Sequence, residues 1–299
     1  MIVKIGGEST TVLSREQTKT LNQRSHVKNT LIEEASSINR RSFLTRASVL
    51  GGAALLPFAG LARAGQNWDT DDGDKDHDRD KSGLTKGDSN IIIAAEIAEA
   101  LAVTTYTNII KTSPFFSGLS ANDQIYLTAA LQEEMSHYLV EESVTGQPTP
   151  YTKFYYPAGM FTDPQTTLDI LVTLEDAFIA AYLVGVRNFS TADLRVTAAR
   201  IMGIESDHRS LARVIAADLN LSTVTGAQGV PEDVNPANNN GYERTLKWTS
   251  ISQAVAALTP FVDITAAGGA GFDTSVSFDF VPFTPTLPTP LGDFISFGG

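Results

Sequence analysis

The segment Leu131–Val140 reads LQEEMSHYLV and holds a Glu-x-x-His motif, Glu134 and His137, inside an otherwise apolar helical run. A second copy of the motif, Glu205 and His208, lies in the segment GIESDHRSL. Residues three apart lie on one face of an α-helix. Each motif therefore presents a carboxylate and an imidazole side by side, and the rest of the chain can be interpreted from this pair.

Apolar residues recur at helical spacing in four long segments around and between the two motifs. We predict helices at residues 89–111, 121–143, 163–188 and 190–219. Ser120, the Asp163-Pro164 pair and Ser190 are typical starting positions for the last three helices. The second and third helices are separated by the long connection 144–162, whereas the third and fourth are joined by a short turn. This spacing predicts two helix pairs linked by one long crossover.

The first and third predicted helices each carry a glutamate followed seven residues later by a tyrosine, Glu99 with Tyr106 and Glu175 with Tyr182. The order Glu, Glu-x-x-His, Glu, Glu-x-x-His is the ligand pattern of di-iron and di-manganese carboxylate proteins. Four carboxylates facing one core would repel each other unless cations balance them. Glutamate and histidine together suit iron, manganese or zinc better than calcium. We therefore predict six metal ligands: Glu99, Glu134, His137, Glu175, Glu205 and His208.

Some neighbouring acidic residues leave alternatives open. Glu96 lies one helical turn before the first predicted ligand and is the alternative to it, and Asp176 directly follows the ligand of the third helix. Glu133 lies one position away from the inner face and is predicted to face solvent, and Asp207 is predicted to face water or pair with an arginine. The two tyrosines are predicted to serve mainly in packing, with hydrogen bonding to the ligands as the alternative.

The composition excludes several classes of site. The 299 residues include no cysteine, which excludes disulfides, zinc fingers, thiolate ligands and cysteine nucleophiles. The net charge of −12 argues against nucleic acid and anionic membranes as partners, and it is compatible with attraction of cations. With 42% hydrophobic residues, the chain can bury a full core.

Residues 1–64 are predicted to be a twin-arginine-type signal peptide. Arg40 and Arg41 precede the apolar run ASVLGGAALLPFAGLA, which leads to the small-residue cleavage site Ala62-Arg63-Ala64. The run is too short and too rich in glycine and alanine for a membrane span, so no stable span is expected after the signal is removed. We expect export by the twin-arginine route to the periplasm or the extracellular space.

The flanks of the predicted bundle differ from it in composition. Residues 65–88 are predicted to be an acidic flexible linker, since the aspartates lack the glycine and closing glutamate of a calcium-binding loop. The bundle itself is predicted to occupy residues 89–219. Residues 220–299 are predicted to be an extension with one short helix at 249–262, a strand within SVSFDFVPF and a Pro/Gly-rich tail.

The segments FTDPQTTLDILVTLEDAFIAAYLVGV and AARIMGIESDHRSLARVIA resemble the ferritin-like family that includes desiccation-related proteins and exported bacterial proteins. The resemblance covers residues 90–219. It implies an all-α fold, a ferritin-like four-helix bundle with one long crossover, to which the irregular C-terminal extension is added. It also implies that Glu99 and Glu175 are terminal ligands, Glu134 and Glu205 bridging ligands, and His137 and His208 one imidazole per metal. The first helix departs most, because ALAVTTY stands where the family has an acidic, aromatic-rich segment.

These observations predict an exported protein with two iron ions that oxidises Fe(II), or reacts with dioxygen or peroxide, in stress protection. A manganese-catalase-like site with two manganese ions would use the same ligands. A non-catalytic stress or structural protein, in which metal only stabilises the bundle, is the alternative from another class. Whether the protein is an enzyme stays open at this point. Metal ions and dioxygen or peroxide are the expected partners, and a homo-oligomer is compatible with the sequence.

Overall fold

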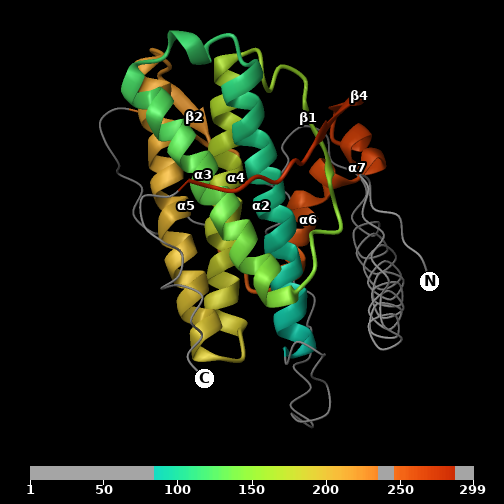
Figure 1. Cartoon of the computed structure of the whole chain (residues 1–299). Coiled ribbons are helices and arrows are strands. Elements are labelled where there is room, and N and C mark those ends of the chain that lie inside the picture. The colour runs from blue at the N-terminus through green and yellow to red at the C-terminus, as the bar shows by residue number, and fades with distance from the viewer. Residues whose placement is uncertain (1–83, 235–245, 287–299) are drawn as a thin grey trace, which may run out of the picture. The chain divides into compact units, whose positions relative to one another are not determined.

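The computed structural model describes residues 84–234 and 246–286. Its main feature is a set of four long helices: α2 (Lys86–Thr112), α3 (Ala121–Thr145), α4 (Pro164–Asn188) and α5 (Ala192–Asp218). α2 packs against α3, and α4 packs against α5 (Figure 1). The predicted four-helix architecture is confirmed. The predicted signal peptide and nearly all of the predicted linker lie outside the described residues.

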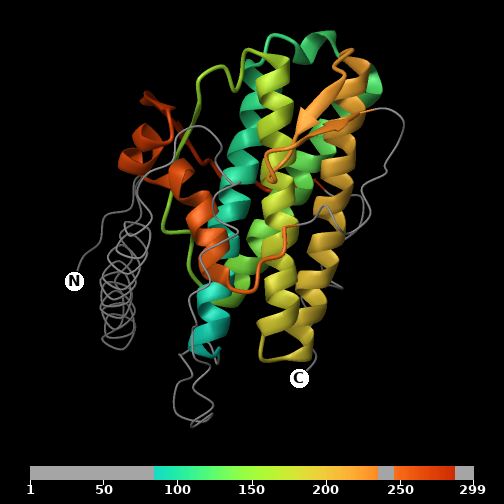
Figure 2. The same ribbon diagram turned by 180° about the vertical axis from the view of Figure 1, so that it is seen from behind.

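The two helix pairs are joined by the crossover 146–163, which contains the strand β1 (Lys153–Pro157). The crossover runs back along the bundle, so that α4 starts at the same end as α3 and runs parallel to it (Figures 1 and 2). α4 and α5 are connected by residues 189–191 alone. The long connection predicted from the sequence therefore lets α4 run parallel to α3. After the short turn, α5 runs antiparallel to α3, so the two Glu-x-x-His helices run in opposite directions.

Side-chain caps fix where all four long helices begin. Ser120 accepts a hydrogen bond from the backbone N–H of the third residue of α3, and Asp163 does the same for α4, as predicted. Pro164 occupies the first turn of α4, where a missing N–H costs nothing. The cap of α5 is Thr191 rather than the predicted Ser190.

Asp88 explains both differences from the predicted helix starts. α2 begins at Lys86 rather than Ser89, because Thr85 and Asp88 form a reciprocal capping box. The same carboxylate accepts a hydrogen bond from the Ser190 backbone N–H at 2.8 Å and one from the Ser190 hydroxyl at 2.5 Å. Asp88 thereby ties the start of α2 to the turn between α4 and α5.

The C-terminal extension is mixed. It contains a hairpin of β2 (Thr223–Thr225) and β3 (Pro231–Asp233), then α6 (Ile251–Val262), α7 (Ile264–Gly269) and β4 (Phe272–Asp279). α6 confirms the predicted short helix. β4 confirms a strand near SVSFDFVPF, but it begins at Phe272, and it pairs antiparallel with β1 of the crossover. The sequence analysis missed β1, β2 and β3, and it predicted one short helix where the structure has two, α6 and α7.

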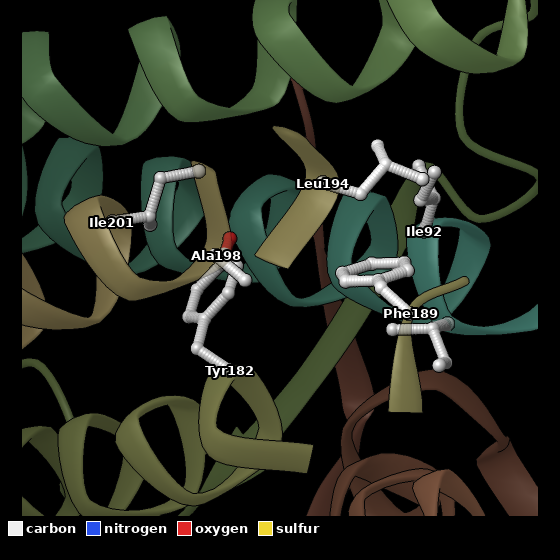
Figure 3. Packing of buried hydrophobic residues seen from close by; sticks show 7 residues of the cluster. Ile92, Tyr182, Phe189, Leu194, Ala198 and Ile201 are labelled. Carbon is white, nitrogen blue, oxygen red and sulfur yellow. The ribbon is translucent and has the colours of Figure 1, made fainter. Parts of the chain in front are cut away.

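One end of the bundle is closed by an apolar cluster in which helix α6 also takes part. Figure 3 shows the ring of Tyr182 against Ala198, with Phe189 and Ile92 close by. α6 packs on α2 and α4, so the extension is part of the same packed unit as the helices. Among the residues that the structure describes, no helix combines the length and the hydropathy of a membrane span.

Candidate metal centre

The six predicted ligands converge in the interior, where the two helix pairs face each other. The structure forms two groups with ligand atoms within 4.8 Å of one another: Glu99, Glu134, His137 and Glu205 in one, and Glu134, Glu175, Glu205 and His208 in the other. All six residues are buried. Glu134 and Glu205 belong to both groups, so each can offer one oxygen to either side.

The distances between the imidazoles and carboxylates are short. His137 Nδ1 lies 3.0 Å from Glu205 Oε1 and 3.6 Å from Glu99 Oε2. His208 Nδ1 lies 2.9 Å from Glu134 Oε1 and 3.5 Å from Glu205 Oε2. The two ring centroids are 6.4 Å apart. Each imidazole thus belongs to one group, while the carboxylates of Glu134 and Glu205 lie between the two rings.

The donor atoms fit a pair of metal ions because they are buried and, apart from the imidazole–carboxylate contacts among themselves, have no protein partner. Eight of them make no hydrogen bond in the structure: Glu99 Oε2, both Glu134 oxygens, His137 Nδ1, Glu175 Oε2, both Glu205 oxygens and His208 Nδ1. A buried polar atom without a partner costs about 1–3 kcal/mol, and more where it is charged. Eight such atoms directed at two common points are accounted for if two cations bind there.

The pKa values of the predicted ligands also fit a site that binds cations. Burial, together with the charges of Glu134 and Glu205, holds the pKa of Glu99 well above its usual value. Burial and the same two charges also raise the pKa of Glu175. The carboxylates in turn raise the pKa of His137, against the lowering effect of burial. The pocket therefore holds protons in the absence of metal, and divalent cations would take over the neutralisation that these protons provide.

A comparison with known families agrees with this geometry. The model of the ferritin-like domain family matches residues 86–218, which are α2 to α5. This part of the chain is a ferritin-like domain. No curated protein matches the chain.

Two tyrosines hold predicted ligands of the ferritin-like domain in place. The Tyr106 hydroxyl donates to Glu175 Oε1 at 2.7 Å. The Tyr182 hydroxyl contacts Glu99 Oε1 and lies 2.7 Å from Glu141 Oε1. Both rings are buried, so the preferred interpretation as packing residues was incomplete: they also fix carboxylate orientation.

Glu133 was predicted to face solvent, and the structure bears this out only in part. Its side chain is 41% exposed, as expected for a residue off the inner face, but its Oε2 lies 2.9 Å from His208 Nε2. Because a carboxylate only accepts, Nε2 carries a proton, and in the neutral ring the lone pair is then on Nδ1, the nitrogen that lies beside Glu134 and Glu205. Glu133 therefore sets the tautomer that a metal-binding His208 needs.

The competing acids lie outside both groups. Glu96 is buried and accepts a hydrogen bond from the Thr145 hydroxyl at 2.9 Å, and burial raises its pKa to about 8. Asp176 pairs with Arg209, and Asp207 is exposed. Glu99 and Glu175 are thus the acids that their helices contribute to the groups. The remaining two histidines, His26 and His77, lie outside the described residues.

The sequence analysis missed Glu141, which is buried beside the site. It follows Glu134 by seven residues, so it lies on the same face of α3, and that spacing was a usable signal. One oxygen contacts Tyr182 and the other makes no hydrogen bond. Burial raises the pKa of Glu141 well above its usual value, although the Tyr182 hydroxyl opposes the shift.

The β2–β3 hairpin is fixed to the outside of α4 and α5 by a buried ionic network. Arg209 pairs with Asp176 and, at 2.6 Å, with Glu232. The backbone N–H of Ala227 donates to Asp176 Oδ2 at 3.0 Å. Asp176 therefore has a structural function next to the predicted ligand Glu175, because its carboxylate is paired with Arg209 and the hairpin backbone.

Proposed function

We propose that this protein is exported and binds two iron ions in its ferritin-like domain, where it oxidises Fe(II) with dioxygen or peroxide. One observation carries the proposal: eight buried donor atoms from four helices converge on two groups and have no protein partner outside these groups. When bound, a pair of iron ions supplies redox chemistry toward dioxygen and peroxide. Manganese in the same ligands is the alternative occupant.

The residues of the site perform three tasks in this proposal. Glu134 and Glu205 supply oxygens to both groups, while one histidine and one further glutamate complete each group. Tyr106, Tyr182 and Glu133 orient ligands through hydrogen bonds. The surrounding helices bury the centre, which excludes bulk water from the reacting species.

The electron balance favours Fe(II) as substrate. Two Fe(II) ions release one electron each, and dioxygen takes up these two electrons with two protons to give hydrogen peroxide. The sequence has no cysteine, so it offers no thiolate-bound iron centre to bring electrons to the site. A substrate that supplies its own electrons fits this composition better than peroxide reduction with an external donor.

The test is anaerobic titration with Fe(II) followed by exposure to dioxygen. We expect two iron ions per chain, oxidation faster than in buffer alone, and hydrogen peroxide formation. Metal analysis of protein from its native host separates iron from manganese, and peroxide dismutation by manganese-loaded protein would favour the alternative metal. If loaded protein is more stable but turns over neither Fe(II) nor peroxide, the metal only stabilises the bundle.

Export is proposed from the sequence pattern around Arg40 and Arg41. Twin-arginine export carries folded proteins, which suits a site filled before transport. Replacing both arginines by lysine should retain the full-length protein in the cytoplasm. Mass spectrometry of the exported wild type should find an N-terminus directly after Ala64, and export of the double variant at the wild-type level would contradict the proposal.

A further inference from the structure

A small apolar cavity lies next to the metal centre, near the turn between α4 and α5. Its volume is about 40 Å³. Helices α2, α3, α4, α5 and α6 all contribute to its walls, which include Ile92, Phe178, Ala198, Ile201 and Leu258. Figure 3 shows part of this wall, with Ala198 and Ile201 on one side and the ring of Tyr182 beneath them.

The cavity is separated from the predicted ligands by one layer of side chains. Ala98, Phe178 and Ile201 line it, and each lies within about one helical turn of a predicted ligand on its own helix. The ring of Tyr182 forms another part of the wall, and its hydroxyl contacts the carboxylate of Glu99. A molecule in the cavity would therefore be held beside the ligand shell rather than at a remote surface.

The walls select an apolar occupant. A buried water needs about two to four polar partners, and a hydrocarbon-lined cavity stays dry and takes up apolar guests such as xenon. The wall is almost entirely apolar, and its polar residues are Tyr182, Glu141 and Thr197. The Tyr182 hydroxyl is already in contact with Glu99 and Glu141. The cavity of about 40 Å³ is also far smaller than the ~150 Å³ that accommodates benzene. A guest of very few atoms fits these limits.

We propose that this cavity binds dioxygen and holds it beside the metal centre before reduction. Dioxygen is apolar and diatomic, and it is the oxidant that the proposed Fe(II) oxidation consumes. The inference rests on the proposed function, because only a dioxygen reaction gives this occupant a use.

Xenon tests the cavity without any turnover. Crystals of the full chain pressurised with xenon should show one strong anomalous peak among Ile92, Tyr182 and Ala198. Ala198→Val and, from a different helix, Ala254→Val fill the cavity and should remove the peak. Ala216→Val is the matched control, since Ala216 is equally buried on α5 but does not line the cavity.

The same variants link the cavity to dioxygen. In iron-loaded protein, a filled cavity should raise the dioxygen concentration needed for half-maximal Fe(II) oxidation on the order of tenfold, the effect of a methylene in a hydrophobic pocket. The iron stoichiometry should stay at the wild-type value. The control variant should retain both the xenon peak and the wild-type dioxygen dependence.

The outcomes separate the cavity from the proposed function. If wild-type protein oxidises Fe(II) but shows no xenon in the cavity, or if filling the cavity changes dioxygen dependence no more than Ala216→Val does, the inference is wrong and the proposed function survives. If xenon binds but loaded wild type consumes no dioxygen, the proposed function fails and the assignment of dioxygen fails with it.

Discussion

The two groups of predicted ligands have the same composition, but the residues that contact these ligands differ between the groups. Tyr182 contacts Glu99 and also Glu141. In the second half, the position four residues after His208 that matches Glu141 is Ala212. A single hydroxyl proton cannot serve two ionised carboxylates, so the group around Tyr182 holds one additional proton. The two groups of predicted ligands are therefore chemically unequal.

Single amide substitutions should reveal which group each carboxylate serves. Glu175→Gln keeps an acceptor for Tyr106 but removes one ligand charge from one group, so we expect one metal ion per chain instead of two. Glu205→Gln removes an oxygen from both groups and should weaken both ions, by at least the 10–100-fold typical of perturbed metal sites. Metal analysis after dialysis measures both stoichiometries.

Glu96→Gln is the matched control for this series. Glu96 is a buried glutamate of α2 that lies outside both groups, so two metal ions should remain. The ligand assignment is wrong if Glu96→Gln lowers the stoichiometry as much as Glu205→Gln does.

The sequence predicted which six residues converge in the interior, but it predicted the residues that orient them less well. Glu134 and His137 share a helix, so their spacing alone places them on one face. Glu133 was assigned to solvent because its partner His208 is on α5, and no local pattern reports that contact. Glu141 had a local signal, the seven-residue step from Glu134, which went unused.

At the level of elements, two glycines should respond in opposite directions to the same change. A Cβ on Gly226 would lie 2.2 Å from Asp176 Oδ2, inside the network that fixes the hairpin. Gly226→Ala should therefore destabilise the protein by about 1–3 kcal/mol. A Cβ on Gly203, within α5, would meet nothing within 4 Å, so Gly203→Ala should stabilise by about 0.5–1 kcal/mol.

Urea denaturation of both glycine variants in the metal-free form measures these changes. Equal effects in the two variants would show that the hairpin is not held by Asp176 as described. The comparison removes the shared entropic effect of alanine on the unfolded chain, because both variants carry it.

The tie between α2 and the α4–α5 turn should be sensitive to acid. Burial tends to raise the pKa of Asp88, but the hydrogen bonds from Ser190 and Thr85 outweigh it and the pKa lies below its usual value of 3.8. A lowered folded-state pKa gives stability that is present above pH ~4 and lost as the pH falls through the folded-state pKa. Asp88→Asn should therefore cost about 1–3 kcal/mol at pH 7 and less at pH 3.

Urea denaturation at both pH values measures the Asp88 effect, with Asp193→Asn as control. Asp193 is an exposed acid in the first turn of α5. A loss in Asp88→Asn that is equally large at pH 3 would contradict the assigned direction of the pKa.

The helices and strands differ in how close together in the sequence the residues lie that determine them. α2 to α6 follow from periodic apolar residues and caps within a few positions, so the sequence predicted them. β1 and β4 exist because Lys153 pairs with Asp279 and Phe154 with Phe278, contacts between distant parts of the chain. No short window contains both partners, so β1 was assigned to an irregular crossover.

For the whole molecule, the predicted ligands join two helix pairs that pack less closely with each other than the two helices of each pair do. α2 packs most closely with α3, and α4 with α5, while each predicted metal group takes ligands from both pairs. In the metal-free protein, this junction holds buried acids whose pKa values are raised by burial and mutual repulsion. Metal binding should therefore strengthen the contact between the pairs more than the contact within each pair.

Removal of metal should lower the stability of the whole domain. With free metal at 100 times its dissociation constant, one bound ion adds about 2.7 kcal/mol, which corresponds to roughly 5–11 °C in Tm for a domain of this size. Scanning calorimetry before and after chelation, and after addition of Fe(II) or Mn(II), measures the shift. Hydrogen exchange should show the largest change in protection where α3 faces α5 and α2 faces α4. If metal changes the Tm of neither the wild type nor Glu205→Gln, the predicted bridging geometry is wrong. If metal raises the Tm of the wild type but not that of Glu205→Gln, the stabilisation depends on the carboxylates between the two pairs.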